Sequence, residues 1–375
     1  MADTTTTTPP ATETPPPPRP PRLRWERFPI RRIILITLAV SIVLGVFFGT
    51  RATLQLGRFD AATWRSLIIA GVARGSVYAL IALGYTLVYG ILFLINFAHG
   101  EVFMAGAFTA FFAASALANA GIMENSPVLG VAVILAVAMV VSTIVAVVLE
   151  RVAYRPLRGS PRLVPLITAI GASLFLQYTF RGLYGASVKA PPPIGGLTAT
   201  GTPPWRILGI AVDRPSGVAI LGAVVLMTVL YVFISRTRTG RSMRAVGEDK
   251  EIASLMGINV DRTIVTTFAI GGMLAGAAGI LYTLLFKQVI FTMGFFPGIK
   301  AFTSAVLGGI GSITGAAVGG LMLGVLEAVG PILFLSGSGI QSPNQLQPVV
   351  AFGILVLVLI FRPGGIFGSP EEKRA

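Results

Sequence analysis

Long apolar blocks alternate with short charged segments along most of the chain. Several blocks approach or exceed the roughly 20 residues that an α-helix needs to cross a bilayer. The predicted single spans are 33–49, 67–94, 102–121, 127–149, 163–180, 218–234, 264–286 and 346–361. Apolar residues make up 54% of the chain and charged residues only 12%, against about 25% charged in a soluble domain. We therefore predict an all-α, polytopic integral membrane protein.

One apolar region, 298–335, is too long for a single span and tight for two. Glycines at 308, 309, 311 and 315 interrupt its middle, so we expect a discontinuous pair of helices and about ten crossings in all. Bilayers tolerate a broken helix only where protein or a water-filled path replaces lipid. The break therefore points toward a transport route.

The arginines set the expected topology. They precede the first block and cluster in 151–162 and 236–262, whereas the Pro- and Gly-rich loop 185–216 carries few charges. Because basic residues accumulate in cytoplasmic loops, we expect both clusters and both termini to be cytoplasmic and 185–216 to be external. The net charge of +14 reflects these flanking arginines, so we expect no nucleic-acid partner.

The expected domain organisation has three parts. Residues 1–32 are rich in Thr, Pro and Arg, a composition typical of a disordered cytoplasmic tail. Residues 33–362 form the transmembrane domain, and 363–375 form a cytoplasmic tail. No small-residue cleavage site follows Gly49, so we interpret the first block as a retained helix and not as a signal peptide.

The chain lacks the residues that several kinds of catalytic and binding site require. The chain has no cysteine, one histidine and no lysine after a glycine, which excludes thiolate metal sites, HExxH zinc sites and a Walker A loop. It also lacks the GxSxG of a hydrolase. The glycines at 309, 311 and 315 form GxGxxxG, which we interpret as a packing break and not a dinucleotide loop. We expect no cofactor, and any ATPase must be a partner.

The charged segment 236–262 contains a candidate docking helix. Asp249 is placed to cap it, and Gly257 is placed to end it. Between them Ile252, Leu255 and Met256 fall at i, i+3 and i+4, on one face. Eight residues make about 12 Å of helix, of a size to fit a groove on another protein. A solvated loop is the alternative.

Ionisable and aromatic residues near the apolar blocks are candidates for a translocation path. His99 with Glu101 forms either a proton relay or a helix junction at the membrane boundary, where Asn96 or His99 satisfies backbone groups. Lys300 and Glu327 lie inside apolar sequence, where an unpaired charge costs at least about 2.5 kcal/mol, so they either pair or line the path. The candidate path residues are Tyr85, Tyr89, Asn96, His99, Glu101, Lys300, Thr303 and Glu327. Tyr85 and Tyr89, at i and i+4, suit a pore lining or an aromatic packing stripe equally.

Four long motifs resemble the LivH-type permeases of high-affinity branched-chain amino acid ABC transporters. They are YALIALGYTLVYGILFLINFAHGEVFMAGAF (78–108), ERVAYRPLR (150–158), AVGEDKEIASLMGINVDR (245–262) and GIKAFTSAVLGGIGSITGA (298–316). The resemblance covers about 67–370, and residues 1–57 have no counterpart in short-tailed members.

The resemblance implies an ABC importer permease in the bacterial plasma membrane. The implied partners are a LivM-type second permease, two cytoplasmic ATP-binding subunits and an external substrate-binding protein, within a lipid bilayer. It also implies that the docking helix is the ATPase-coupling segment. The matching residues are Glu248, Asp249, Ile252, Ala253, Leu255, Met256 and Gly257.

Two questions stay open at this point. The alternative class is an ion-coupled secondary transporter of small polar solutes that uses His99, Glu101 and Glu327. The substrate is also open between leucine, isoleucine and valine on one side and urea, short amides or other amino acids on the other.

Overall fold

The computed structural model describes residues 30–161, 163–199, 201–207, 209–340, 342–362 and 364–367. The predicted tails lie outside these residues, apart from 30–32 and 364–367; Arg162 also lies outside them. The chain divides into two compact units, Met1–Phe48 and Gly49–Ala375.

The first unit contains most of helix α1 (Ile30–Leu56), which continues into the second unit. The helix starts three residues earlier than the predicted span and ends seven residues later. Its apolar side chains are mostly exposed, including Ile36, Val43 and Phe47. A helix that is apolar on every side is typical of a membrane span.

The second unit is almost entirely helical, which confirms the predicted all-α class. Its α-helices are α2 (Ala61–Leu92), α3 (His99–Asn119), α4 (Ile122–Asn125), α5 (Pro127–Leu149), α6 (Leu163–Tyr184), α7 (Arg214–Arg236), α8 (Arg238–Glu248), α9 (Lys250–Leu255), α10 (Val260–Phe286), α11 (Phe295–Gly308), α12 (Ile313–Leu335) and α13 (Gln347–Phe361). A π-helical turn (Glu150–Tyr154) and three short 3₁₀ turns (Arg155–Leu157, Ser336–Ser338, Pro343–Leu346) complete the helical elements.

The loop between α6 and α7 contains a small hairpin. Strands β1 (Trp205–Ile207) and β2 (Ile210–Val212) pair antiparallel, with Trp205 opposite Val212. The turn signals of this region predicted an irregular loop, and the hairpin is too short to have produced a clear alternating pattern.

Nine helices in the described part of the chain are long and apolar enough to cross a membrane. The predicted break in 298–335 is confirmed, because α11 ends at Gly308 and α12 begins at Ile313. Gly309 and Gly311 have positive φ angles of 105° and 95°, which favour glycine. The fourteen-residue α11 is about 21 Å long, shorter than the other membrane helices.

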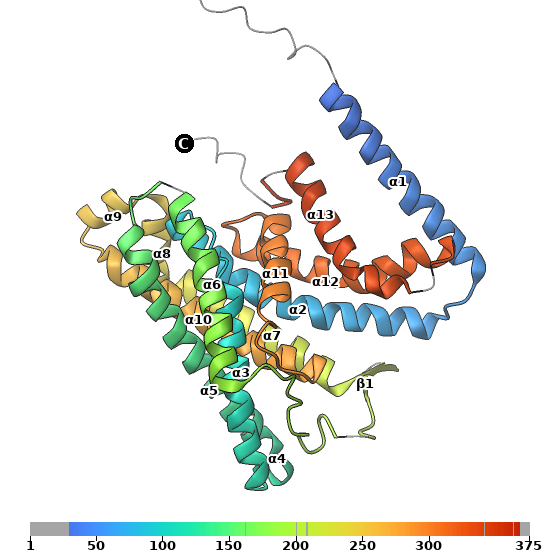
Figure 1. The fold of residues 1–375 in the computed structure, drawn as a ribbon, viewed down its shortest axis with the longest axis horizontal. Helices are drawn as coiled ribbons and strands as arrows, with labels where there is room; N and C mark the ends of the chain where they lie inside the picture. Colours follow the sequence, from blue (N-terminus) through green and yellow to red (C-terminus); the bar gives the residue numbers. More distant parts are fainter. Residues whose placement is uncertain are drawn as a thin grey trace, which may run out of the picture. The chain divides into compact units, whose positions relative to one another are not determined.

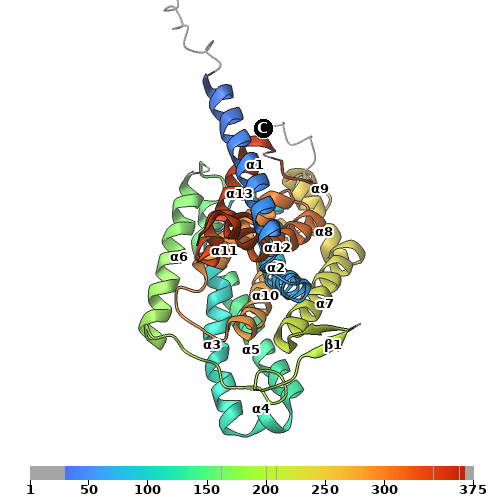
Figure 2. The same ribbon diagram turned by 90° about the vertical axis from the view of Figure 1, so that its right-hand side faces the viewer.

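Small residues set the closest helix contacts. Helix α2 and helix α12 lie side by side (Figures 1 and 2). A Cβ added at Gly75 would lie 2.8 Å from backbone atoms of Gly320 and Leu321, and one at Gly324 would overlap the Gly75 backbone. Small residues at intervals of four thus bring the backbones of the two helices into contact. Membrane helices rely on such close packing, because lipid tails are as apolar as the side chains and burial from water contributes little.

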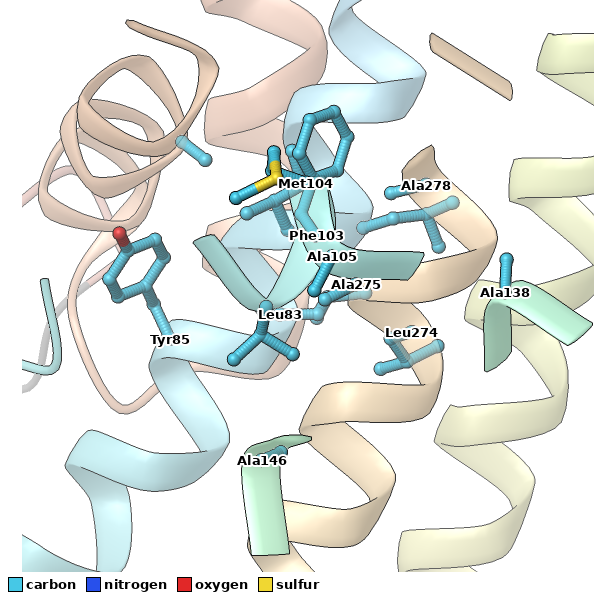
Figure 3. Close-up of a cluster of buried hydrophobic side chains, with 14 of the residues drawn as sticks. Leu83, Tyr85, Phe103, Met104, Ala105, Ala138, Ala146, Leu274, Ala275 and Ala278 are labelled. Carbon is cyan, nitrogen blue, oxygen red and sulfur yellow. The ribbon is translucent and has the colours of Figure 1, made fainter. Parts of the chain in front are cut away.

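Helices α2, α3, α5 and α10 contribute to the main core, part of which is shown in Figure 3. Ala138 and Ala146 of α5 and Ala275 of α10 are fully or almost fully buried there. The Ser142 hydroxyl donates to the Val102 carbonyl oxygen at 2.8 Å and joins α5 to α3. This packing fixes where α3 begins, which positions the candidate site.

The second unit has two opposite ends. Helices α8 and α9 lie at one end of the bundle and α4 at the other, in both views (Figures 1 and 2). At the α9 end, Arg155 contacts Asp261 at the start of α10. Near the other end, Lys189 and Val289 exchange backbone hydrogen bonds of 2.8 Å. The two arginine-rich segments therefore share one end of the bundle.

Candidate functional site

The segment predicted to dock a partner contains two helices, not one. Helix α8 was not predicted; its first turn is capped by the Thr237 hydroxyl, which accepts from the Gly240 amide at 3.0 Å. Met243 and Val246 of α8 are buried against the membrane helices. This anchored helix holds the start of α9.

The two residues predicted to cap the docking helix, Asp249 and Gly257, do so in the structure. The Asp249 carboxylate accepts from the amides of Glu251 and Ile252 at 2.8 and 2.9 Å. At the other end Gly257 has a φ of 81°, and the Ile258 amide donates to the Ala253 carbonyl, the pattern of a glycine C-cap. The helix has six residues, about 9 Å, and not the predicted eight.

Helix α9 presents apolar side chains outward. Ile252, Leu255 and Met256 are 60%, 87% and 77% exposed. Ala253, on the opposite face, is buried against the rest of the protein, whereas Glu248 and Gly257 are exposed. Helix α9 is therefore held on one side and offers an unpaired apolar face on the other.

Helix α9 also contacts the end of α2. The ammonium group of Lys250 lies 5.9 Å from the centre of the Phe93 ring. Burial and then repulsion from Arg158 lower the pKa of Lys250 below its ordinary value. A displacement of α9 would therefore act directly on the junction that follows α2.

An ionic cluster joins the π-helical turn to α10 beside α9. Arg158 donates to the buried Glu150 and also to Asp261, and Arg155 donates to Asp261 at 2.6 Å. Glu150 has no exposed side-chain surface. Sequence inspection missed this cluster because Arg158 and Asp261 are 103 positions apart.

The start of α3 packs beside α2, away from the end of that helix. His99 begins α3, and a Cβ at Gly84 would overlap its ring, which also lies 4.9 Å from the Tyr85 ring. Because Gly84 precedes the end of α2 by eight residues, His99 lies about 12 Å along that helix from its end. Segment 93–98 therefore folds back along α2, and the position of this junction at the membrane boundary stays a prediction.

Asn96 lies in this returning segment. Its side-chain oxygen accepts from the Tyr154 hydroxyl at 2.5 Å, and its backbone carbonyl accepts from the His99 amide at 3.0 Å. The π-helical turn is thus bonded directly to the junction. Tyr154 was not among the predicted site residues, since nothing in its local sequence indicates a partner 58 positions away.

Glu101 points away from His99, toward α6 and α11. It accepts from Gln177 at 2.7 Å and from Ser173 at 3.2 Å, both on α6. A Cβ at Gly294 would lie 2.6 Å from the second Glu101 oxygen, so this carboxylate lies at the N-terminus of α11. Anionic groups are favourable at that position. No hydrogen bond joins His99 to Glu101 in the described chain.

The starts of α3 and α11 meet backbone to backbone. A Cβ at Gly298 would lie 3.1 Å from the Gly100 Cα, and one at Gly294 would overlap the Gly100 carbonyl. Tyr85 packs against Phe302 of α11 at 6.1 Å between ring centres. The N-termini of α3 and of α11, the first half of the broken pair, therefore converge inside the bundle, as expected for a route through a transporter.

Lys300 and Glu327 form an ion pair across the broken helices. The ammonium nitrogen of Lys300 lies 2.6 Å from a Glu327 oxygen, and the two side chains are 13% and 2% exposed. The Tyr78 ring lies 5.7 Å from the same ammonium group.

The remaining two candidates pack locally. Thr303 is buried and donates to the Ile299 carbonyl, while the Tyr89 ring lies 6.1 Å from that of Phe93. The candidate residues thus form neighbouring groups around α3 and α11, not a single cluster.

A polytopic helical bundle with a broken membrane helix and an outward apolar face on α9 has the architecture of a membrane transport permease. It is not an enzyme. The chain belongs to the family described as the permease component of the branched-chain amino acid transport system, whose model matches residues 67–359.

Curated relatives cover most of this chain. It is 44% identical over 308 residues to the high-affinity branched-chain amino acid transport system permease protein BraD of Pseudomonas aeruginosa, covering 82% of this chain and 96% of BraD. It is 42% identical over 311 residues to the corresponding permease LivH of Escherichia coli, covering 81% of this chain and 95% of LivH.

Proposed function

We propose that this chain is the LivH-type subunit of an ABC importer for branched-chain or related amino acids in the bacterial plasma membrane. The observation that carries the proposal is the outward apolar face of α9 on a membrane-spanning bundle of this family. The named activity of its relatives supports the substrate class. The partners are a LivM-type permease, two cytoplasmic ATP-binding subunits and an external substrate-binding protein.

In this proposal α9 moves as a rigid body, and its side chains Ile252, Leu255 and Met256 insert into an apolar groove on the ATPase. Closure of the ATPase pair on ATP displaces α9, and two contacts transmit the displacement. One runs from Lys250 to Phe93 at the end of α2, and the other is the short connection from α9 to α10. The converging starts of α3 and α11 then re-pack between outward and inward access.

The geometry gives less support to ion-coupled transport. A proton relay needs groups within hydrogen-bond reach of one another. His99 packs against α2, whereas Glu101 bonds to α6, and Glu327 is engaged by Lys300. These three residues do not form a continuous ionisable chain.

Uptake in reconstituted vesicles tests the proposed function. Purified permease pair, ATPases and binding protein should accumulate labelled leucine only when ATP is supplied on the ATPase side. A proton or sodium gradient without ATP should give no uptake. Gradient-driven uptake without ATP would contradict the proposal and favour the secondary transporter, and competition by urea or short amides would define the substrate range.

Single cysteines in this cysteine-free chain test the topology. We expect Ser242→Cys to react with an impermeant thiol reagent only from the cytoplasmic side, because it lies in the arginine-rich segment. Ser187→Cys, in the loop between α6 and α7, should react only from outside. Labelling of Ser242→Cys in intact cells would place this segment outside the cell and contradict the proposed orientation.

A further inference from the structure

A polar cleft of about 760 Å³ opens beside α9 and is unused by the docking described above. One wall is the π-helical turn and the residue after it, with Arg151 and Arg155; the other is the start of α10, with Arg262 and Thr266. Asp261 also lines the cleft. Three guanidinium groups therefore face one space at the end of the membrane helices.

The positive charge of the cleft is only partly neutralised. Asp261 is engaged by Arg155 and Arg158, and Glu150 is engaged by Arg158. Arg151 and Arg262 are exposed and have no acidic partner among the described residues. The cluster is left with two positive charges in excess, which suits a phosphate group.

An exposed apolar face leads into the cleft along α5. Val140, Ile144 and Val148 are 57%, 57% and 52% exposed and repeat at intervals of four. Arg151 follows Ile144 by seven residues, so it lies on the same helical face.

Helix α10 continues this surface. It packs beside α5, with the Thr143 hydroxyl 3.4 Å from the Ala269 carbonyl. Thr266 and the exposed Met273 follow Arg262 by four and eleven residues, on the side of α10 that opens into the cleft. Charge at the helix ends is therefore continuous with apolar surface within the membrane.

We propose that this cleft binds the phosphate headgroup of an anionic phospholipid. Arg151 and Arg262 hold the phosphate, and the acyl chains lie along Val140, Ile144 and Val148. Basic pockets between membrane helices at the membrane surface recognise such headgroups. An acidic segment of a partner protein would satisfy the arginines but would leave the continuous apolar face unexplained, so the surface favours a lipid.

Lipid titration of the delipidated complex in detergent tests this proposal. Phosphatidylglycerol should raise the melting temperature and remain bound in native mass spectrometry, whereas phosphatidylcholine should bind at least about tenfold more weakly. In Arg151→Gln with Arg262→Gln, phosphatidylglycerol affinity should fall by roughly tenfold or more, at about 1 kcal/mol per basic residue. Arg151→Lys with Arg262→Lys should retain most binding, because the charge is kept.

A matched charge control uses Arg238→Gln with Arg241→Gln, two exposed arginines on α8, which should bind phosphatidylglycerol as the wild type does. Equal phosphatidylglycerol binding by the cleft variant and this control would overturn the proposal. Loss of the ATPase subunits from the cleft variant with unchanged lipid binding would assign the cleft to a protein partner instead. Glycerol phosphate lacks acyl chains and should not stabilise the complex; stabilisation equal to that by phosphatidylglycerol would reject a lipid site.

Discussion

Glu327→Gln is expected to lower the free energy of unfolding by about 3–5 kcal/mol, as found when one partner of a buried ion pair is removed. The reason is local: the substitution leaves the Lys300 ammonium, which is 13% exposed, without its carboxylate. Lys300→Met with Glu327→Gln removes both charges and should recover much of the loss. Thermal melting of the purified complex measures both effects.

Glu124→Gln is the matched control, since Glu124 is an exposed carboxylate on α4 without an ion-pair partner in the described chain. It should melt at the wild-type temperature. Additive losses in the Lys300 and Glu327 double variant would show that the two side chains do not depend on each other. Uptake assays distinguish an effect on transport from an effect on stability. Wild-type uptake by Glu327→Gln alone and by Lys300→Met alone would exclude these two residues from the candidate translocation path.

The membrane helices were predictable because their signal is local and strong. Helix α5 has the predicted bounds, and the break in 298–335 lies among the glycines that indicated it. The caps of α9 were also predictable, since Asp249 bonds within three residues and Gly257 adopts the left-handed conformation. Helix α8 was missed because two glycines and three arginines among its eleven residues gave it the composition of a charged loop.

The arrangement of the site was less predictable, because its contacts join residues far apart. Lys300 and Glu327 were recognisable because each charge stands in apolar sequence, where pairing or hydration is required. Tyr154 and Ser173 had no comparable indication in the sequence. Gln177 was a weaker indication, because it is a polar residue within the apolar α6. His99 packs against α2 because Gly84 leaves room for its ring, and only the folded chain brings these two residues together.

Leu255→Asp with Met256→Asp should abolish ATP-driven uptake while leaving the permease folded. These side chains are 87% and 77% exposed, so replacing them removes little internal packing. Loss of an anchor side chain at an interface costs about 2 kcal/mol or more, so two such losses should weaken ATPase docking by roughly a hundredfold or more. Asp249 still caps α9 in this variant, which keeps the helix in place.

Leu255→Met with Met256→Leu is the control at the same positions, because it keeps the apolar volume. It should transport as the wild type does. Three measurements separate docking from folding: the melting temperature of the permease pair, the amount of ATPase that copurifies, and leucine uptake in vesicles. The aspartate variant should keep the wild-type melting temperature but lose both the copurified ATPase and leucine uptake. The reason is that burying an unpaired carboxylate in an apolar groove is costly. Wild-type uptake by that variant would show that α9 does not couple the ATPase to transport.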